Sequence, residues 1–136
     1  MKLLNKNVDA GLLVLRLSLG ILMLLHGLAK LTHGAEGIGQ MLSAAGWPSW
    51  IAYGVYIGEI VAPILIILGY ATRMAASVFL FNMVVAVAMV HAGDIFALGN
   101  TGGWAIELQG LYLFGALTLM FTGAGKYALS QKNWWD

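Results

Sequence analysis

The chain has 136 residues, of which 60% are hydrophobic and only 10% are charged, against about 25% charged residues in an ordinary soluble domain. So few charges cannot cover the surface of a soluble globule, which excludes an ordinary cytosolic domain and also a disordered chain. The net charge of +1 gives no basic surface for nucleic acid, and the absence of cysteine excludes disulfides, thiol nucleophiles and thiolate metal sites. The composition therefore predicts a small integral membrane protein.

Four segments are long and apolar enough to cross a bilayer, which requires about 20 mostly apolar residues. In chain order they are residues 11–31, 51–70, 74–92 and 104–122. We therefore predict an all-α fold, a single domain over residues 1–136 that forms an integral membrane four-helix bundle. Arg16 interrupts the first segment, which argues against a cleaved signal peptide.

The linkers between these segments differ in length and character. Residues 36–45 are predicted to form a short helix between the first and second spans, closed by Gly46, Trp47 and Pro48. Because tryptophan suits the headgroup layer, this helix is expected to be interfacial. A tight turn at residues 71–73 makes a hairpin of the second and third spans, and the glycine-rich residues 93–103 precede the fourth.

The positive charges predict the orientation of the chain. With the N-terminus inside, all but one of the lysines and arginines near the span ends fall on the cytoplasmic side: Lys2, Lys6, Arg73, Lys126 and Lys132. Only Lys30 falls at the outer side. We therefore expect both termini to be cytoplasmic, with Trp134 and Trp135 as an inner interfacial anchor.

The few polar side chains within the spans are the candidates for function, since a charge at membrane depth costs about 2.5–3.5 kcal/mol. They are Arg16, His26, Lys30, Glu59, Asn82, His91, Glu107 and Gln109. At a rise of about 1.5 Å per residue, five of them, from four different helices, fall in the outer half of the membrane. These five are His26, Lys30, Glu59, His91 and Glu107. Their common depth predicts a polar pocket that opens outward.

Helical spacing predicts which of these side chains share a face. Arg16, Gly20, Met23, Gly27 and Lys30 form one stripe of the first span, which we expect to face the bundle.

The third span fits a shared pocket less well. Asn82 and His91 are nine positions apart and point to opposite sides. Both can line one pocket only if the helix is distorted.

Glu59 is the strongest candidate, because a buried carboxylate needs a cationic partner or must be protonated. Arg16 and Lys30 are the candidate partners. Pro63 has no N–H, so the carbonyl of Glu59 loses its helical donor and the helix is expected to kink there. The alternative is a purely structural ion pair in a kinked helix.

The other candidates also have structural alternatives. His91 and Lys30 could simply lie at helix ends, in contact with water or headgroups. His26 could serve only to pack within the bundle, and Asn82 could serve only to form a hydrogen bond between helices. A haem between His26 and His91 would be crowded by Lys30 and the glutamates, so neither haem nor metal is expected.

A quinone or another lipid-soluble redox molecule fits the pattern better, because it needs an apolar slot and a few polar groups that bind carbonyls and move protons. In this hypothesis Glu59 is the catalytic, proton-handling carboxyl and His26 is a hydrogen-bond donor or proton relay. Arg16 and Lys30 are counter-charges. Glu107 and His91 lie at the mouth, and Asn82 is a further substrate-binding candidate.

These residues and their order resemble the DoxX family. The resemblance covers nearly the whole chain and is carried by these pieces: Arg16 to Gly20, His26-Gly27, Lys30-Leu31, Gly58-Glu59, Gly69, Thr72-Arg73, His91, Gly102-Gly103, Glu107, Tyr112, Gly123, Gly125, Lys126 and Tyr127. One departure is Ala124, where many members carry proline; it affects the exit turn and not the site.

The resemblance implies a four-helix protein of bacterial or archaeal inner membranes, related to the small subunit of thiosulfate:quinone oxidoreductase. It implies quinone-linked redox chemistry, with this chain as a subunit beside a partner redox protein, and leaves homo-oligomerisation open. Two alternatives remain: a non-enzymatic anchor or assembly factor for a redox enzyme, and a small proton or solute pathway.

Overall fold

The computed structural model describes residues 6–136, which fold into helices without strands, as the all-α prediction required. The helices, in chain order, are α1 (Val8–His33), α2 (Glu36–Ala44), η2 (Ser49–Tyr53), α3 (Gly54–Tyr56), η3 (Ile57–Val61), α4 (Ala62–Leu68), α5 (Thr72–Val90), η4 (Ala92–Asp94) and α6 (Glu107–Thr122). Segments η2 to α4 follow one another without a break and make a single helical run.

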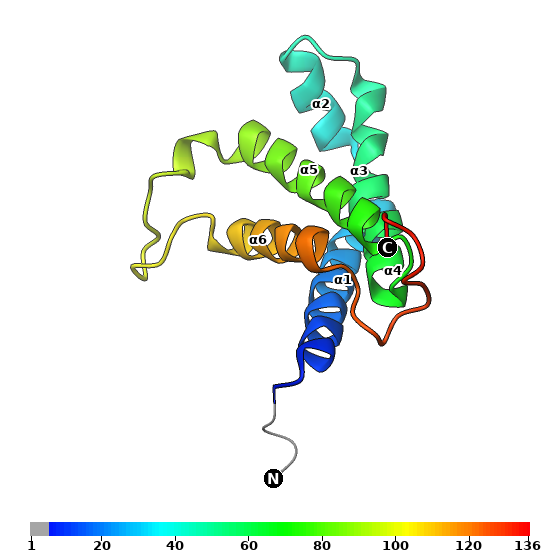
Figure 1. Cartoon of the computed structure of the whole chain (residues 1–136). Helices are drawn as coiled ribbons and strands as arrows, with labels where there is room; N and C mark the ends of the chain where they lie inside the picture. Colours follow the sequence, from blue (N-terminus) through cyan, green and yellow to red (C-terminus); the bar gives the residue numbers. More distant parts are fainter. Residues whose placement is uncertain (1–5) are drawn as a thin grey trace.

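The long helices are arranged as two pairs. α1 packs against α4, and α5 packs along α6. Figure 1 shows that the two pairs meet near the C-terminus, where α5 also contacts α4, and that α5 and α6 extend from there to the left toward the loop between them. α2 and the start of the helical run lie at the top of the same view, above α5.

Three helical segments are long and apolar enough to cross a membrane: Val8–His33, Ser49–Leu68 and Thr72–Val90. The fourth predicted span is shorter in the structure, because α6 has 16 residues and Trp104 instead belongs to the preceding loop, in a bridge with Leu98. Large apolar side chains are widely exposed, including Phe81, Leu111 and Phe121. Such a surface fits contact with lipid and not with water.

Glycines bring α1 close to the second helical run. A Cβ on Gly20 would lie 3.0 Å from the carbonyl oxygen of Pro63, and one on Gly27 would collide with the carbonyl of Glu59. The predicted stripe of α1 does face the protein, since the buried residues of this helix include Arg16 and Met23 beside these two glycines.

Proline does not break the second run, because the helix adapts before it. Residues Ile57–Val61 form a π-helical turn in which the N–H of Ala62 donates to the carbonyl of Ile57, five positions earlier. The wider turn is a common insertion at functional sites. The predicted kink at Pro63 is therefore a local change of helix type around Glu59.

The main core lies where the two pairs meet. Phe79 and Ala76 of α5, Ile66 of α4 and Leu119 and Ala116 of α6 are completely buried there. A second, smaller cluster holds α2 against the helical run. It consists of Ala35, Leu42 and Ala52.

The C-terminal segment covers the end where the pairs meet. The side chain of Asp136 accepts a hydrogen bond from the N–H of Ala71 at 3.0 Å, in the turn between α4 and α5. Arg73 donates to the carbonyl of Trp134, and the N–H of Lys126 donates to Asp9 at the start of α1. Arg73 and Lys126 therefore share one end of the molecule, whereas Lys2 lies outside the described residues.

Candidate functional site

A cavity of about 560 Å³ lies between the helix pairs. Its walls come from α1, α2, the helical run, α5 and α6, and most of its lining is apolar, with Met23, Leu42 and Met89 among the contributors. The polar side chains that line it are His26, Lys30, Glu59, Asn82, His91, Gln109 and Tyr112. The cavity has the size and the composition of a small-molecule site.

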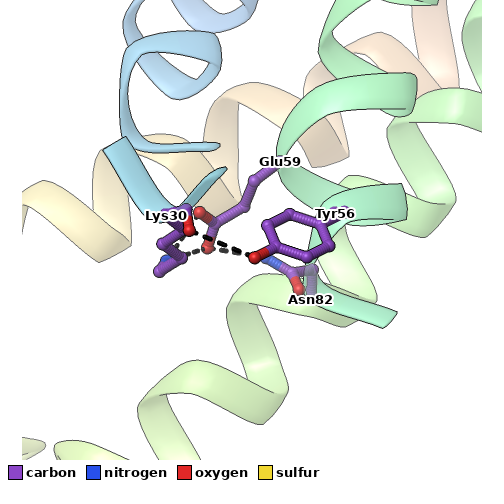
Figure 2. A network of polar contacts seen from close by, with 4 residues as sticks. All are labelled: Lys30, Tyr56, Glu59 and Asn82. Atoms are coloured by element: carbon purple, nitrogen blue, oxygen red, sulfur yellow. Dashed lines mark hydrogen bonds and ion pairs between the residues drawn. The ribbon is translucent and has the colours of Figure 1, made fainter. Parts of the chain in front are cut away.

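An ion pair lies within this cavity (Figure 2). Lys30 Nζ donates to both carboxylate oxygens of Glu59, each at 2.6 Å. The Glu59 side chain is only 5% exposed, while that of Lys30 is 33% exposed. Asn82 Nδ2 lies 3.4 Å from Glu59 Oε1, and the Tyr56 hydroxyl donates to the main-chain carbonyl of Lys30 at 3.1 Å. The carboxylate is thus held from α1 and α5, and the lysine keeps an open side.

The backbone around Glu59 explains this placement. Gly58 lies directly against the Asn82 side chain, where any Cβ would collide with it, so the helical run and α5 can approach at this level. The carbonyl of Glu59, which the sequence predicted to lose its donor to Pro63, lies against Gly27 of α1. The π-helical turn is therefore in close contact with α1 through Gly27 and with α5 through Gly58.

His26 lies one turn before Lys30 on α1 and lines the same cavity. Its ring meets that of Tyr112 edge to face, with ring centroids 6.1 Å apart. Tyr112 is nearly buried and also packs against Phe79 of the core. His26 is thus held at the edge of the cavity by its ring contact with the buried Tyr112.

His91 and Asn82 both line the cavity, contrary to the expectation that they point to opposite sides. The reason is that α5 ends at Val90, and His91 already has a non-helical backbone with φ −121° and ψ 16°. The helical angle between the two positions therefore no longer applies. His91 contacts Asp94 and Gln109.

Arg16 does not line the cavity and does not pair with Glu59. Its guanidinium is 1% exposed and donates to four main-chain carbonyls, those of Ile66, Ile67, Ala124 and Tyr127. Arg16 lies 14 positions before Lys30, about 21 Å along the helix, which explains why the two side chains serve different ends of the molecule. The proposed counter-charge role in the pocket therefore falls to Lys30 alone.

Glu107 also lies away from the cavity. It begins α6, its side chain is exposed, and its carboxylate lies beside Gly103 in the preceding loop. Its position along the chain places it at the same end of the molecule as the cavity, next to Leu108, which lines it. The loop conformation, which the sequence does not reveal, turns it away from the mouth.

Four polar residues join the site without having been assigned roles from the sequence: Tyr56, Asp94, Gln109 and Tyr112. A spacing of three positions offered a signal for each of them. Tyr56 lies three positions before Glu59, and Asp94 lies three positions after His91. Gln109 and Tyr112 share a face of α6 by the same spacing.

The family model described as DoxX matches residues 11–92, which is more than half of the chain. The chain belongs to the DoxX family. It is 33% identical over 125 residues to a protein of Bacillus subtilis named "Putative oxidoreductase CatD", covering 92% of this chain and 88% of that one. It is 36% identical over 121 residues to an uncharacterised protein of Haemophilus influenzae, covering 87% of each chain. No solved structure matches.

Membership of the DoxX family and the three apolar helices identify a multi-pass membrane protein. The family match includes five of the seven polar residues that line the cavity: His26, Lys30, Glu59, Asn82 and His91. It ends before α6, so Gln109 and Tyr112 lie outside the matched range.

Proposed function

We propose that this DoxX-family protein is a membrane oxidoreductase subunit that binds a quinone, or a similar lipid-soluble redox molecule, in the cavity between its helix pairs. The observation that carries the proposal is an apolar cavity of about 560 Å³ with its polar groups gathered around the Lys30–Glu59 ion pair. A relative named as an oxidoreductase supports the same class of chemistry.

The groups in the cavity suit the two needs of such a ligand. The partly open Lys30 ammonium would donate a hydrogen bond to a ligand carbonyl, and the Glu59 carboxylate beside it would accept or supply a proton. His26 would be a second donor or a proton relay from the edge of the cavity. Asn82 would hold Glu59 in position.

The proposed setting is a bacterial or archaeal inner membrane, with both termini cytoplasmic and a redox partner protein beside this subunit. The α6 helix alone measures about 24 Å, short of the roughly 30 Å hydrocarbon core. We propose that it nevertheless makes the fourth crossing, together with residues 104–106, which precede it in the chain. The cavity would then open toward the outer face.

The test is a search for a bound ligand in the purified protein. Native mass spectrometry of the detergent-purified full chain is combined with organic extraction and an absorbance spectrum. We expect a quinone or another isoprenoid to accompany the wild-type protein. We expect Glu59→Gln to lose it, while the matched control Glu107→Gln, outside the cavity, retains it.

Glu59→Gln leaves the Lys30 charge unpaired, which by itself could unfold the variant and so release the ligand. The double variant Lys30→Gln with Glu59→Gln removes both charges and isolates the effect on binding. Full retention of the ligand by that folded double variant would contradict the proposal. A ligand-free wild-type protein that arrives with a stoichiometric partner would favour the anchor or assembly reading instead.

A further inference from the structure

A second polar cluster lies at the far end of the same cavity. His91 lines the cavity directly after α5, about 13 Å along the helix axis from Asn82. Its Nδ1 lies 3.3 Å from Asp94 Oδ2, in the short η4 turn, and its Nε2 lies 3.2 Å from Gln109 Nε2 of α6. The cluster is thus built from three separate elements around one imidazole ring.

The partners determine how the ring carries its proton. The carboxylate of Asp94 only accepts, so Nδ1 is the nitrogen that bears hydrogen. The Nε2 atom is then the acceptor, and the amide N–H of Gln109 donates to it. The basic Nε2 of His91 therefore faces α6 and the cavity, while Nδ1, on the other side of the ring, contacts the Asp94 carboxylate.

The cluster also reaches the surface. The Asp94 side chain is 50% exposed and that of His91 is 32% exposed, whereas Glu59 deeper in the cavity is only 5% exposed. Among the described residues, the other charged or titratable groups that line this cavity are His26, Lys30, Glu59 and Tyr112. Asp94 does not line the cavity, but it is the charged group that contacts His91. His91 is therefore the one of these groups that connects the cavity with an exposed carboxylate.

We propose that His91 is the proton-exchange residue of the cavity, with Asp94 as its positioning residue. The inference rests on the proposed function, and it names the ligand form concerned: a hydroxyl-bearing hydroquinone. The ligand hydroxyl takes the place of the Gln109 amide and donates to Nε2. The O–H bond breaks with its electron pair left on oxygen, and an N–H bond forms at Nε2. Asp94 stabilises the resulting imidazolium, which releases a proton to water.

The proposal separates the reduced and oxidised forms of the ligand. A quinone has carbonyl groups and no hydroxyl, so it makes no use of an acceptor nitrogen at His91. A hydroquinone does, and a protonated imidazole can no longer accept from it. The affinity for hydroquinone should therefore fall as the pH is lowered, whereas the affinity for quinone should not fall, because a protonated Nε2 can donate to a quinone carbonyl.

The experiment measures the binding of a short-chain hydroquinone and of the corresponding quinone to the full-length protein in detergent, from about pH 5 to about pH 8. We expect His91→Gln, whose amide oxygen still accepts a hydrogen bond but takes up no proton, to remove the pH dependence of hydroquinone binding. We expect His91→Leu, which has no acceptor, to weaken hydroquinone binding by about tenfold. Asp94→Asn should show a smaller loss in the same direction. The control Glu36→Gln, an acidic residue of α2 outside the cavity lining, should match the wild type.

The outcomes distinguish the two proposals. If the wild type binds neither form, the proposed function fails and this inference with it. If both forms bind and His91→Leu changes them equally or not at all, quinone binding stands and the role of His91 is wrong. Nitrogen-15 spectra of the histidines add a ligand-free readout: the wild type should show His91 protonated at Nδ1, and Asp94→Asn should lose that preference.

Discussion

Arg16 shows how a single buried charge can be satisfied without a carboxylate. Its guanidinium lies among the carbonyls of Ile66 and Ile67, at the C-terminal end of α4, and those of Ala124 and Tyr127 in the final segment. Carbonyls at the end of a helix carry partial negative charge, and that of Ile66 accepts from Arg16 in addition to the N–H of Gly69. Arg16 therefore ties α1, α4 and the final segment into one unit.

Arg16→Lys should destabilise the protein by about 2–4 kcal/mol, because an ammonium cannot reach the four carbonyls that the planar guanidinium serves. The free energy of unfolding, measured by denaturant titration in mixed micelles, checks this expectation. Lys132→Arg is the matched control: it exchanges the same two residue types at an exposed position and should change the stability by about 0.5 kcal/mol or less. Equal losses in the two variants would refute the special role of Arg16.

The polar residues of the spans could be found from the sequence, but their partners could be predicted only in part. Burial of a carboxylate at Glu59 demanded a cation, and Lys30 is that cation. The same reasoning left Arg16 as an alternative partner, because the main-chain carbonyls that actually bind it carry no signal in a hydropathy pattern. Charge requirements can be predicted from a sequence, whereas main-chain acceptors depend on where helices end.

At the level of elements, the π-helical turn Ile57–Val61 and Gly27 of α1 form a matched pair. The wider turn brings the carbonyl of Glu59 toward α1, and the missing side chain at Gly27 makes room for it. The contact places the Lys30 and Glu59 side chains, from the two elements, within reach of each other.

Gly27→Ala should therefore push α1 away from the turn. A Cβ there would lie only 2.6 Å from Ile60 Cγ1 and would collide with the Glu59 carbonyl. We expect a loss of stability of about 1–3 kcal/mol, the usual cost of overpacking, together with weaker binding of any cavity ligand. Thermal unfolding and ligand extraction measure the two effects. Gly11→Ala, which faces open space on the same helix, should leave ligand binding unchanged and raise the stability by about 0.5–1 kcal/mol, because alanine favours the helix. A loss of stability there similar to that of Gly27→Ala would contradict the role of the contact.

Helix positions were predictable because apolar length and turn residues mark them. The predicted helix at residues 36–45 is α2, Glu36–Ala44, and the predicted hairpin turn separates α4 from α5. The shared cavity position of Asn82 and His91 was not predictable, since it depends on α5 ending one residue before His91. Helical periodicity describes faces only inside a helix, so functional residues at helix ends escape it.

On the scale of the whole molecule, the C-terminal segment closes the end where the helix pairs meet. The hydroxyl of Ser130 lowers the pKa of Asp136 below its ordinary value of 3.8, with further help from the backbone N–H groups of Asn133, Ala71 and Lys132 and against the effect of burial. A lowered pKa in the folded protein means that these bonds stabilise it above about pH 3.8. That stabilisation is lost as the pH falls through the lowered value.

Acidification should therefore detach this segment before the helices unfold. Hydrogen exchange at the Ala71 amide, which donates to Asp136, should accelerate at strongly acidic pH relative to the intrinsic rate. Asp136→Asn should show faster exchange already at neutral pH and little further acid effect. An Ala71 amide equally protected in both proteins at neutral pH would show that the carboxylate does not hold the segment.

The arrangement of the helix pairs also has a mechanical consequence. The pairs are joined at one end, and beyond that junction Gly58 lies against Asn82, while Met89, near the far end of α5, packs against the small cluster of Ala35, Leu42 and Ala52. From Asn82 to Val90 is about 12 Å of helix, so a rotation of about 10° at the contact of Gly58 with Asn82 moves the far end of α5 by about 2 Å. Such a rotation would therefore change the contact of Met89 with that cluster. The width of the cavity is thus coupled to the packing of α2 against the helical run, because Met89, Leu42 and Ala52 all line it.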